Sequence, residues 1–111
     1  MIIQYKTPEA EANHIDYDVN KNKTTVCFDD ELTLKLSKIE KDDPVHKDIC
    51  FDEDGDLVVG AAAGWAYVAE IDIPARRYED VPVEGGEEGE TEHRPLPLDM
   101  DTVTLTLWAV D

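Results

Sequence analysis

The sequence predicts a small all-β protein, an antiparallel sandwich or barrel of about six to eight short strands with at most one short N-terminal helix. Apolar residues alternate with polar ones at a period of two along much of the chain, which is typical of half-buried strands. Turn-forming segments separate these runs at regular intervals. The length of 111 residues suits one domain, residues 1–111, with a single modest core.

The first quarter of the chain combines one helical start with one hairpin. Thr7 suits a helix cap with Pro8 at the first helical position, and the helix lasts barely two turns. From residue 14, apolar residues alternate with aspartates, the polar segment Asn20–Lys23 follows, and a β-branched and aromatic run comes next. This pattern predicts a hairpin over residues 14–28.

The middle of the chain holds one ambiguous segment and one clear hairpin. Leucines alternate over residues 32–36 as in a strand, but the same leucines together with Ile39 also match helical spacing, so both alternatives stay open. Two apolar runs, residues 45–51 and 56–60, flank the sequence Asp-Glu-Asp-Gly. Because Asp-Gly between apolar runs favours a tight turn, these runs are expected to pair.

Two regular strands are predicted in the second half. Over residues 65–73, the pleat is expected to place Trp65 and Tyr67 on one face with the isoleucines, and Glu70 and Asp72 on the other. The strand should end at the proline that follows.

The last strand is predicted over residues 103–109, in the run TVTLTLWAV. Leu105 and Leu107 share one face, and Trp108 lies with threonines on the other. An exposed indole is costly in free energy, so Trp108 is expected to be covered either by a second sheet of the same domain or by a partner protein.

An acidic segment interrupts the strand pattern. Residues 79–92 hold seven acidic side chains and no basic one, and Glu84–Glu92 contains three glycines and no large apolar residue. We expect a mobile acidic loop at about residues 84–92, because glycine is costly to order and like charges repel. The following residues, 94–98, form RPLPL, which lacks P-x-x-P spacing and is interpreted as an extended spacer.

The charge of the chain restricts its partners. There are 27 acidic and 10 basic residues, a net charge of −17. This field repels phosphate and anionic lipid, so no direct nucleic-acid or membrane binding is expected. No apolar run approaches the ~20 residues of a membrane helix, and no leader pattern opens the chain, so a cytoplasmic location is expected.

The cysteines, the histidines and one aspartate cluster are considered as sites for a disulfide or a metal ion. Cys27 and Cys50 lie in apolar runs and are expected to be reduced, although a disulfide stays open if their strands are neighbours. The three histidines lack zinc spacing, so neither a metal nor another cofactor is expected. Asp52, Asp54 and Asp56 resemble the start of a calcium loop but lack its glycine and closing glutamate, which leaves weak Ca²⁺ or Mg²⁺ binding as an alternative.

No arrangement of residues predicts catalysis, since no triad or activated thiol stands out among the abundant carboxylates. The candidate interaction residues are Arg76, Arg77, Tyr78 and Trp108, residue types that are enriched at binding hot spots. For the two arginines, pairing with nearby carboxylates is the competing interpretation.

We therefore expect a non-enzymatic acidic β-domain that binds a protein partner or associates with itself. Its size and class also suit a structural or accessory protein of a phage or mobile element. One alternative is a DNA mimic whose carboxylates occupy the basic groove of a nucleic-acid-binding protein. An acidic ridge on rigid strands would favour the mimic, and an apolar patch beside Arg76 and Tyr78 would favour assembly.

Overall fold

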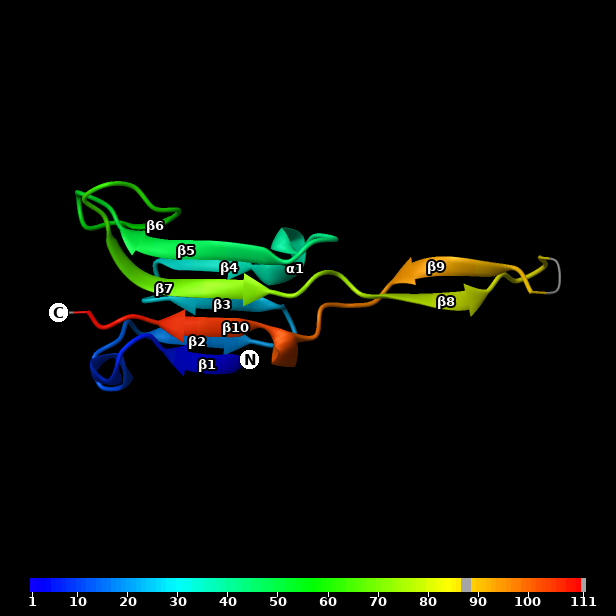
Figure 1. Cartoon of the computed structure of the whole chain (residues 1–111), viewed down its shortest axis with the longest axis horizontal. Coiled ribbons are helices and arrows are strands. Elements are labelled where there is room, and N and C mark those ends of the chain that lie inside the picture. The colour runs from blue at the N-terminus through cyan, green and yellow to red at the C-terminus, as the bar shows by residue number, and fades with distance from the viewer. Residues whose placement is uncertain (87–88, 111) are drawn as a thin grey trace.

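The computed structural model describes residues 1–86 and 89–110 and confirms the all-β class. Within these residues, ten strands form a five-stranded, a three-stranded and a two-stranded sheet. The two larger sheets pack face to face as a sandwich, and the two-stranded sheet projects from one end (Figure 1). The radius of gyration is 17.7 Å, whereas a compact chain of this length has about 13 Å. The projecting sheet accounts for the difference.

The five-stranded sheet has the order β1-β10-β7-β5-β6. Its strands are β1 (Ile2–Tyr5), β10 (Thr104–Leu107), β7 (Ala66–Ile73), β5 (Val45–Phe51) and β6 (Leu57–Val59). The predicted pairing of β5 with β6 is confirmed, with Gly55 at φ +81° in the turn. Neighbours are antiparallel except β1 and β10, which pair in parallel. The sequence did not predict β1, a short edge strand.

The three-stranded sheet contains β2 (Tyr17–Asn20), β3 (Thr25–Phe28) and β4 (Leu32–Lys35). Strands β2 and β3 form the hairpin expected over residues 14–28. Both alternatives for the leucine segment hold in part, because β4 ends at Lys35 and the single-turn helix α1 (Leu36–Ile39) follows at once. Leu36 is fully buried, which ties this turn to the core.

The hydrophobic core lies between the two large sheets. Alternate residues of β3 and β10 enter it, as the period of two predicts. Val26 and Phe28 of β3 face the core from one side, and Leu105 and Leu107 of β10 face it from the other. These four side chains are fully buried.

A bulge at Val68 overturns the expected faces of β7. Ile49 of β5 pairs with Ala69, whereas Cys50 pairs with Tyr67, so Val68 is an extra residue on β7. Val68 and Ala69 are both buried in consequence. Beyond the bulge the alternation shifts by one residue, and Tyr67 lies on the outer face of the sheet, stacked on Trp108.

The two-stranded sheet, which we call the arm, is inserted in the connection from β7 to β10 (Figure 1). Strand β8 (Tyr78–Pro82) pairs with β9 (Thr91–Pro95) in antiparallel register. The spacer interpretation is therefore wrong for Arg94 and Pro95, and the loop interpretation is wrong for Thr91 and Glu92.

Cross-strand pairs explain why β9 forms. Glu79 lies opposite Arg94 in the register, and His93 contacts Asp80 at 3.0 Å and stacks on Tyr78. Opposite charges and ring contacts across a strand pair are stabilising. The remaining part of the expected mobile loop includes residues 87 and 88, which lie outside the described residues.

Helices are short. The expected N-terminal helix is a 3-10 turn, Pro8–Glu11, whose Thr7 side chain makes no capping hydrogen bond. A second 3-10 turn, Met100–Thr102, precedes β10, and the Asp99 side chain accepts a hydrogen bond from its backbone. In the described part of the chain, no helix is long and apolar enough to cross a membrane.

Candidate functional site

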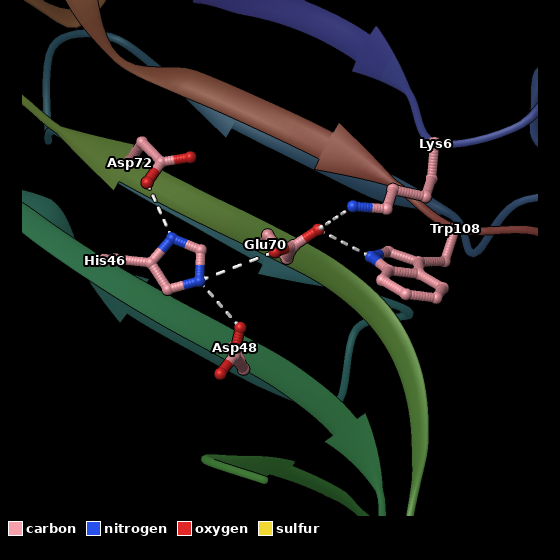
Figure 2. A network of polar contacts seen from close by, with 6 residues as sticks. All are labelled: Lys6, His46, Asp48, Glu70, Asp72 and Trp108. Atoms are coloured by element: carbon pink, nitrogen blue, oxygen red, sulfur yellow. Dashed lines mark hydrogen bonds and ion pairs between the residues drawn. The ribbon is translucent and has the colours of Figure 1, made fainter.

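The outer face of the five-stranded sheet carries a polar network. The three-stranded sheet covers the inner face, and in Figure 1 no described element lies in front of β5, β7 and β10. Six residues on this face interact (Figure 2), and we call them the His46 network. They are Lys6, His46, Asp48, Glu70, Asp72 and Trp108.

The strand register brings four of these residues together. His46 of β5 lies directly opposite Asp72 of β7, and Asp48 lies directly opposite Glu70. Because side chains alternate along a strand, a His-x-Asp segment on β5 faces a Glu-x-Asp segment on β7 on one side of the sheet. Glu70 and Asp72 are held on both sides, because β7 pairs with β10 and with β5 at these positions. Strand β6 pairs only with Ile49–Phe51 of β5, so His46 and Asp48 have a paired strand on the β7 side alone.

His46 lies between carboxylates (Figure 2). Its Nδ1 is 2.6 Å from Oδ1 of Asp72, and its Nε2 is 2.8 Å from Oδ1 of Asp48 and 3.5 Å from Oε1 of Glu70. Hydrogen bonds to Asp72 and then to Asp48 raise the pKa of His46 above its ordinary value. A carboxylate only accepts hydrogen bonds, so two such partners favour the imidazolium.

Glu70 is the most enclosed carboxylate of the network, with 18% of its side chain exposed. Its Oε2 accepts a hydrogen bond of 2.8 Å from Nε1 of Trp108, and Nζ of Lys6 lies 3.8 Å away. The Lys6 ammonium also lies 5.1 Å from the centroid of the Trp108 ring. One oxygen of Glu70 is therefore held by the indole and the ammonium, while the other points towards His46.

Trp108 has neighbours in its own sheet that the sequence did not predict. Trp108 does lie on the face opposite Leu105 and Leu107, but it is partly buried there rather than fully exposed. Stacking on Tyr67 and the hydrogen bond to Glu70 cover the ring and satisfy its N–H. The stack of Tyr67 on Trp108 could not be predicted from the sequence, because the bulge at Val68 changes the face on which Tyr67 lies.

The candidate metal residues Asp52, Asp54 and Asp56 meet at the β5–β6 turn. Oδ1 of Asp52 accepts backbone hydrogen bonds from Asp54 at 2.9 Å and from Asp56 at 3.0 Å. An aspartate that bonds the backbone two residues on is a standard turn-forming arrangement. The cluster is thus explained by the turn that it builds.

Arg76 and Tyr78 lie at the base of the arm. Nη2 of Arg76 donates to the backbone carbonyl of Glu40 at 2.9 Å, and its Nε lies 3.5 Å from Oε1 of Glu40. Nη1 donates to Asp42 at 3.3 Å, and the Tyr78 hydroxyl also donates to Asp42. Glu40 is buried, with 9% of its surface exposed. Arg76 therefore compensates a buried carboxylate and fastens the arm to the sandwich.

Arg77 differs from its neighbour. Its side chain is 58% exposed, and its contact with Asp99 is a long 3.8 Å. The two arginines have different surroundings, and local pairing accounts for Arg76 better than for Arg77. The structure does not bring Arg77 together with Trp108. Trp108 directly follows the last residue of β10, and the end of β10 points away from the arm (Figure 1).

Both cysteines are free thiols. Cys27 lies in the three-stranded sheet, and Cys50 lies in the five-stranded sheet on the face opposite Ile49. Burial, followed by the charges of Asp48 and Glu70, raises the pKa of Cys50. A buried thiol with a raised pKa is a poor nucleophile.

The His46 network was missed because its parts are far apart in the sequence. The pairing of β5 with β7 joins His46 and Asp48 to Glu70 and Asp72, and Trp108 and Lys6 reach Glu70 from beside β10. The one indication in the sequence was alternation of ionisable residues on β5 and β7. No protein-family model matches the chain, and no curated protein or solved structure was found to be similar to it. An origin in a phage or mobile element thus stays a prediction.

Proposed function

We propose that this protein is a non-enzymatic assembly module that binds a protein partner through its arm. The observation that carries the proposal is the projection of β8 and β9 away from the sandwich, with every residue of β9 exposed (Figure 1). A two-stranded hairpin alone is marginally stable in water. Docking against a partner would stabilise the arm and cover its strands.

The open edges of the arm favour this role. Strands β8 and β9 pair only with each other in the described sheets, so each keeps one edge with unpaired backbone groups. Exposed edges are templates for pairing with a strand from another chain. Val81 adds a partly buried apolar side chain beside these edges.

Charge suggests the nature of the partner. Residues 79–92 carry seven acidic side chains, so a basic protein surface is complementary to the arm. Two copies of a chain with a net charge of −17 repel each other, which makes a basic partner a better proposal than self-association.

The DNA-mimic alternative has less support. Several carboxylates on or beside the rigid sheets are paired with cationic or imidazole groups of the same chain. These pairs are Lys6–Glu70, His46–Asp72, Lys21–Asp101 and Arg76–Glu40. Local pairing lowers the charge that such residues can present to a basic groove.

The test compares three forms of the protein. In the first variant, Asn-Gly replaces residues 79–94, because Tyr78 and Pro95 face each other and suit a two-residue turn. In the second, the seven acids of residues 79–92 become amides, so that the arm loses its charge. The wild-type chain is the third form. Partners captured from cell extract are compared, and oligomeric state is measured by analytical ultracentrifugation.

We expect a captured partner to be lost with the arm and weakened by the neutral arm. Equal capture by the wild type and the armless variant would contradict the proposal. Self-association that disappears with the arm would assign the arm to contacts between copies. Displacement of the partner by duplex DNA would favour the mimic.

A further inference from the structure

We propose that the His46 network binds a divalent transition-metal ion, with Zn²⁺ as the best match, through Nε2 of His46 and the carboxylates of Asp48 and Glu70. Asp72 would orient His46 without contacting the ion. This inference is independent of the arm, because it rests on the outer face of the five-stranded sheet, to which β8 and β9 contribute no residue.

The three ligand atoms already converge. One atom from each of His46, Asp48 and Glu70 lies within 4.8 Å of the other two. Zn²⁺ bonds of about 2.0–2.2 Å in a tetrahedral site separate ligand atoms by about 3.3 Å. The observed separations from Nε2 of His46, 2.8 Å to Asp48 and 3.5 Å to Glu70, lie on either side of this value. Small side-chain movements would admit an ion.

The groups behind the ligands are those that metal sites use. A ligating histidine usually donates its other ring N–H to a carboxylate, which fixes the ring and its tautomer. Here the carboxylate is that of Asp72, whose Oδ1 lies 2.6 Å from Nδ1 of His46 and accepts its hydrogen bond. Glu70 is held from behind as well, because Oε2 accepts from Trp108 and leaves Oε1 directed at His46 (Figure 2).

The network has three carboxylates, those of Asp48, Glu70 and Asp72, against two cationic groups, His46 and Lys6. Asp48 and Glu70 are direct cross-strand neighbours, and like charges in such positions destabilise a strand pair. Lys6 approaches only the oxygen of Glu70 that faces Trp108. A divalent ion between Asp48 and Glu70 would neutralise the pair and join β5 to β7.

The donor set selects the class of ion. Imidazole with carboxylates suits Zn²⁺ and its neighbours in the first transition row, whereas Ca²⁺ and Mg²⁺ prefer oxygen ligands alone. Three protein ligands leave at least one position for water. The side chain of His46 is 47% exposed, so the ion has access from solvent.

The experiment uses the whole chain, stripped of metal with chelator, and ZnCl₂ as the probe. Isothermal titration calorimetry should show one ion per chain, and Zn²⁺ should raise the melting temperature, because it binds only the folded site. His46→Gln and Glu70→Gln should each weaken binding at least about tenfold, and Asp72→Asn about 10–100-fold, as expected for an orienting partner.

Two matched controls distinguish this site from other ligands. Asp54→Asn alters the separate acidic cluster at the β5–β6 turn, and Cys27→Ser removes a partly exposed thiol. Both variants should bind Zn²⁺ like the wild type. Nitrogen NMR of the wild-type protein, which needs no variant, should show a Zn²⁺-induced shift at Nε2 of His46.

Three outcomes would overturn the proposal. They are an absence of saturable Zn²⁺ binding, binding that persists in His46→Gln, and binding that Asp54→Asn or Cys27→Ser abolishes. A Zn²⁺ titration that leaves the His46 ring nitrogens unshifted would do the same even where a variant fails to fold.

Discussion

Tyr67 and Trp108 stack across neighbouring strands, with ring centroids 4.7 Å apart and planes 18° from parallel. The bulge at Val68 makes this contact possible, because it moves Tyr67 to the outer face of β7. The stack covers one side of the indole, and Glu70 satisfies its N–H. Trp108 is thus held by neighbours in its own sheet, and its role as an interaction residue stays a prediction.

Replacing Trp108 should destabilise the fold without unfolding it. Trp108→Ala removes the stack and the hydrogen bond to Glu70, and we expect a loss of about 1–3 kcal/mol in the free energy of unfolding. Trp108→Phe keeps a ring on Tyr67 and should cost less. Urea denaturation measures both. A Trp108→Ala variant as stable as the wild type but altered in oligomeric state would instead make Trp108 an interface residue.

Arg76 and Arg77 are adjacent arginines with different surroundings, so Arg77 serves as the control for a substitution of Arg76. Arg76→Ala leaves the carboxylate of Glu40 buried without its cation, and unpaired buried charges are strongly unfavourable. We expect a clear fall in melting temperature for Arg76→Ala and almost none for Arg77→Ala, whose side chain is mainly solvated. Equal effects in differential scanning calorimetry would contradict this assignment.

The arm should be dispensable for the stability of the sandwich. No arm residue belongs to the core cluster, and Arg76 remains when Asn-Gly replaces residues 79–94. The free energy of unfolding should change by no more than about 1 kcal/mol, because loop length alters closure entropy slowly. Circular dichroism with urea checks this. Loss of the folded state would show that the arm takes part in folding.

The pKa of Asp101 should rise when Lys21 is replaced. A hydrogen bond from Lys21, 2.8 Å long, lowers the pKa of Asp101. A lowered pKa in the fold gives stability above the unfolded value of about 3.9, and this stability is lost as pH falls through the folded pKa. Lys21→Ala should raise the pKa of Asp101 in an NMR titration. Lys23→Ala, in the same loop, is the control and should leave it low.

The local pattern of the chain predicted most of the sandwich. Alternation located β2, β3, β5, β7 and β10, and Asp-Gly located the β5–β6 turn. Each of these features depends on residues close together in the sequence. Strand β1 was missed because its pairing with β10 is parallel and distant. The arm was missed because glycines and acids dominate the turn between its strands.

The candidate site was less predictable than the fold. The faces of β7 depend on a single extra residue, Val68, whose effect appears only when β7 is aligned with β5. His46 looked isolated in the sequence, since its partners Asp72 and Glu70 lie more than twenty residues further along. Contacts of this kind are set by strand register, which alternation alone does not specify.

The parallel pairing of β1 with β10 has a consequence for how the chain folds. Ile2 lies opposite Thr104, so β1, near the start of the sequence, can pair only after β10, near its end, has been synthesised. During synthesis, β1 therefore leaves the ribosome about a hundred residues before β10, its neighbour in the described sheet. Such distant contacts slow folding. Because β10 lies between β1 and β7, its synthesis is needed before the five-stranded sheet can be completed.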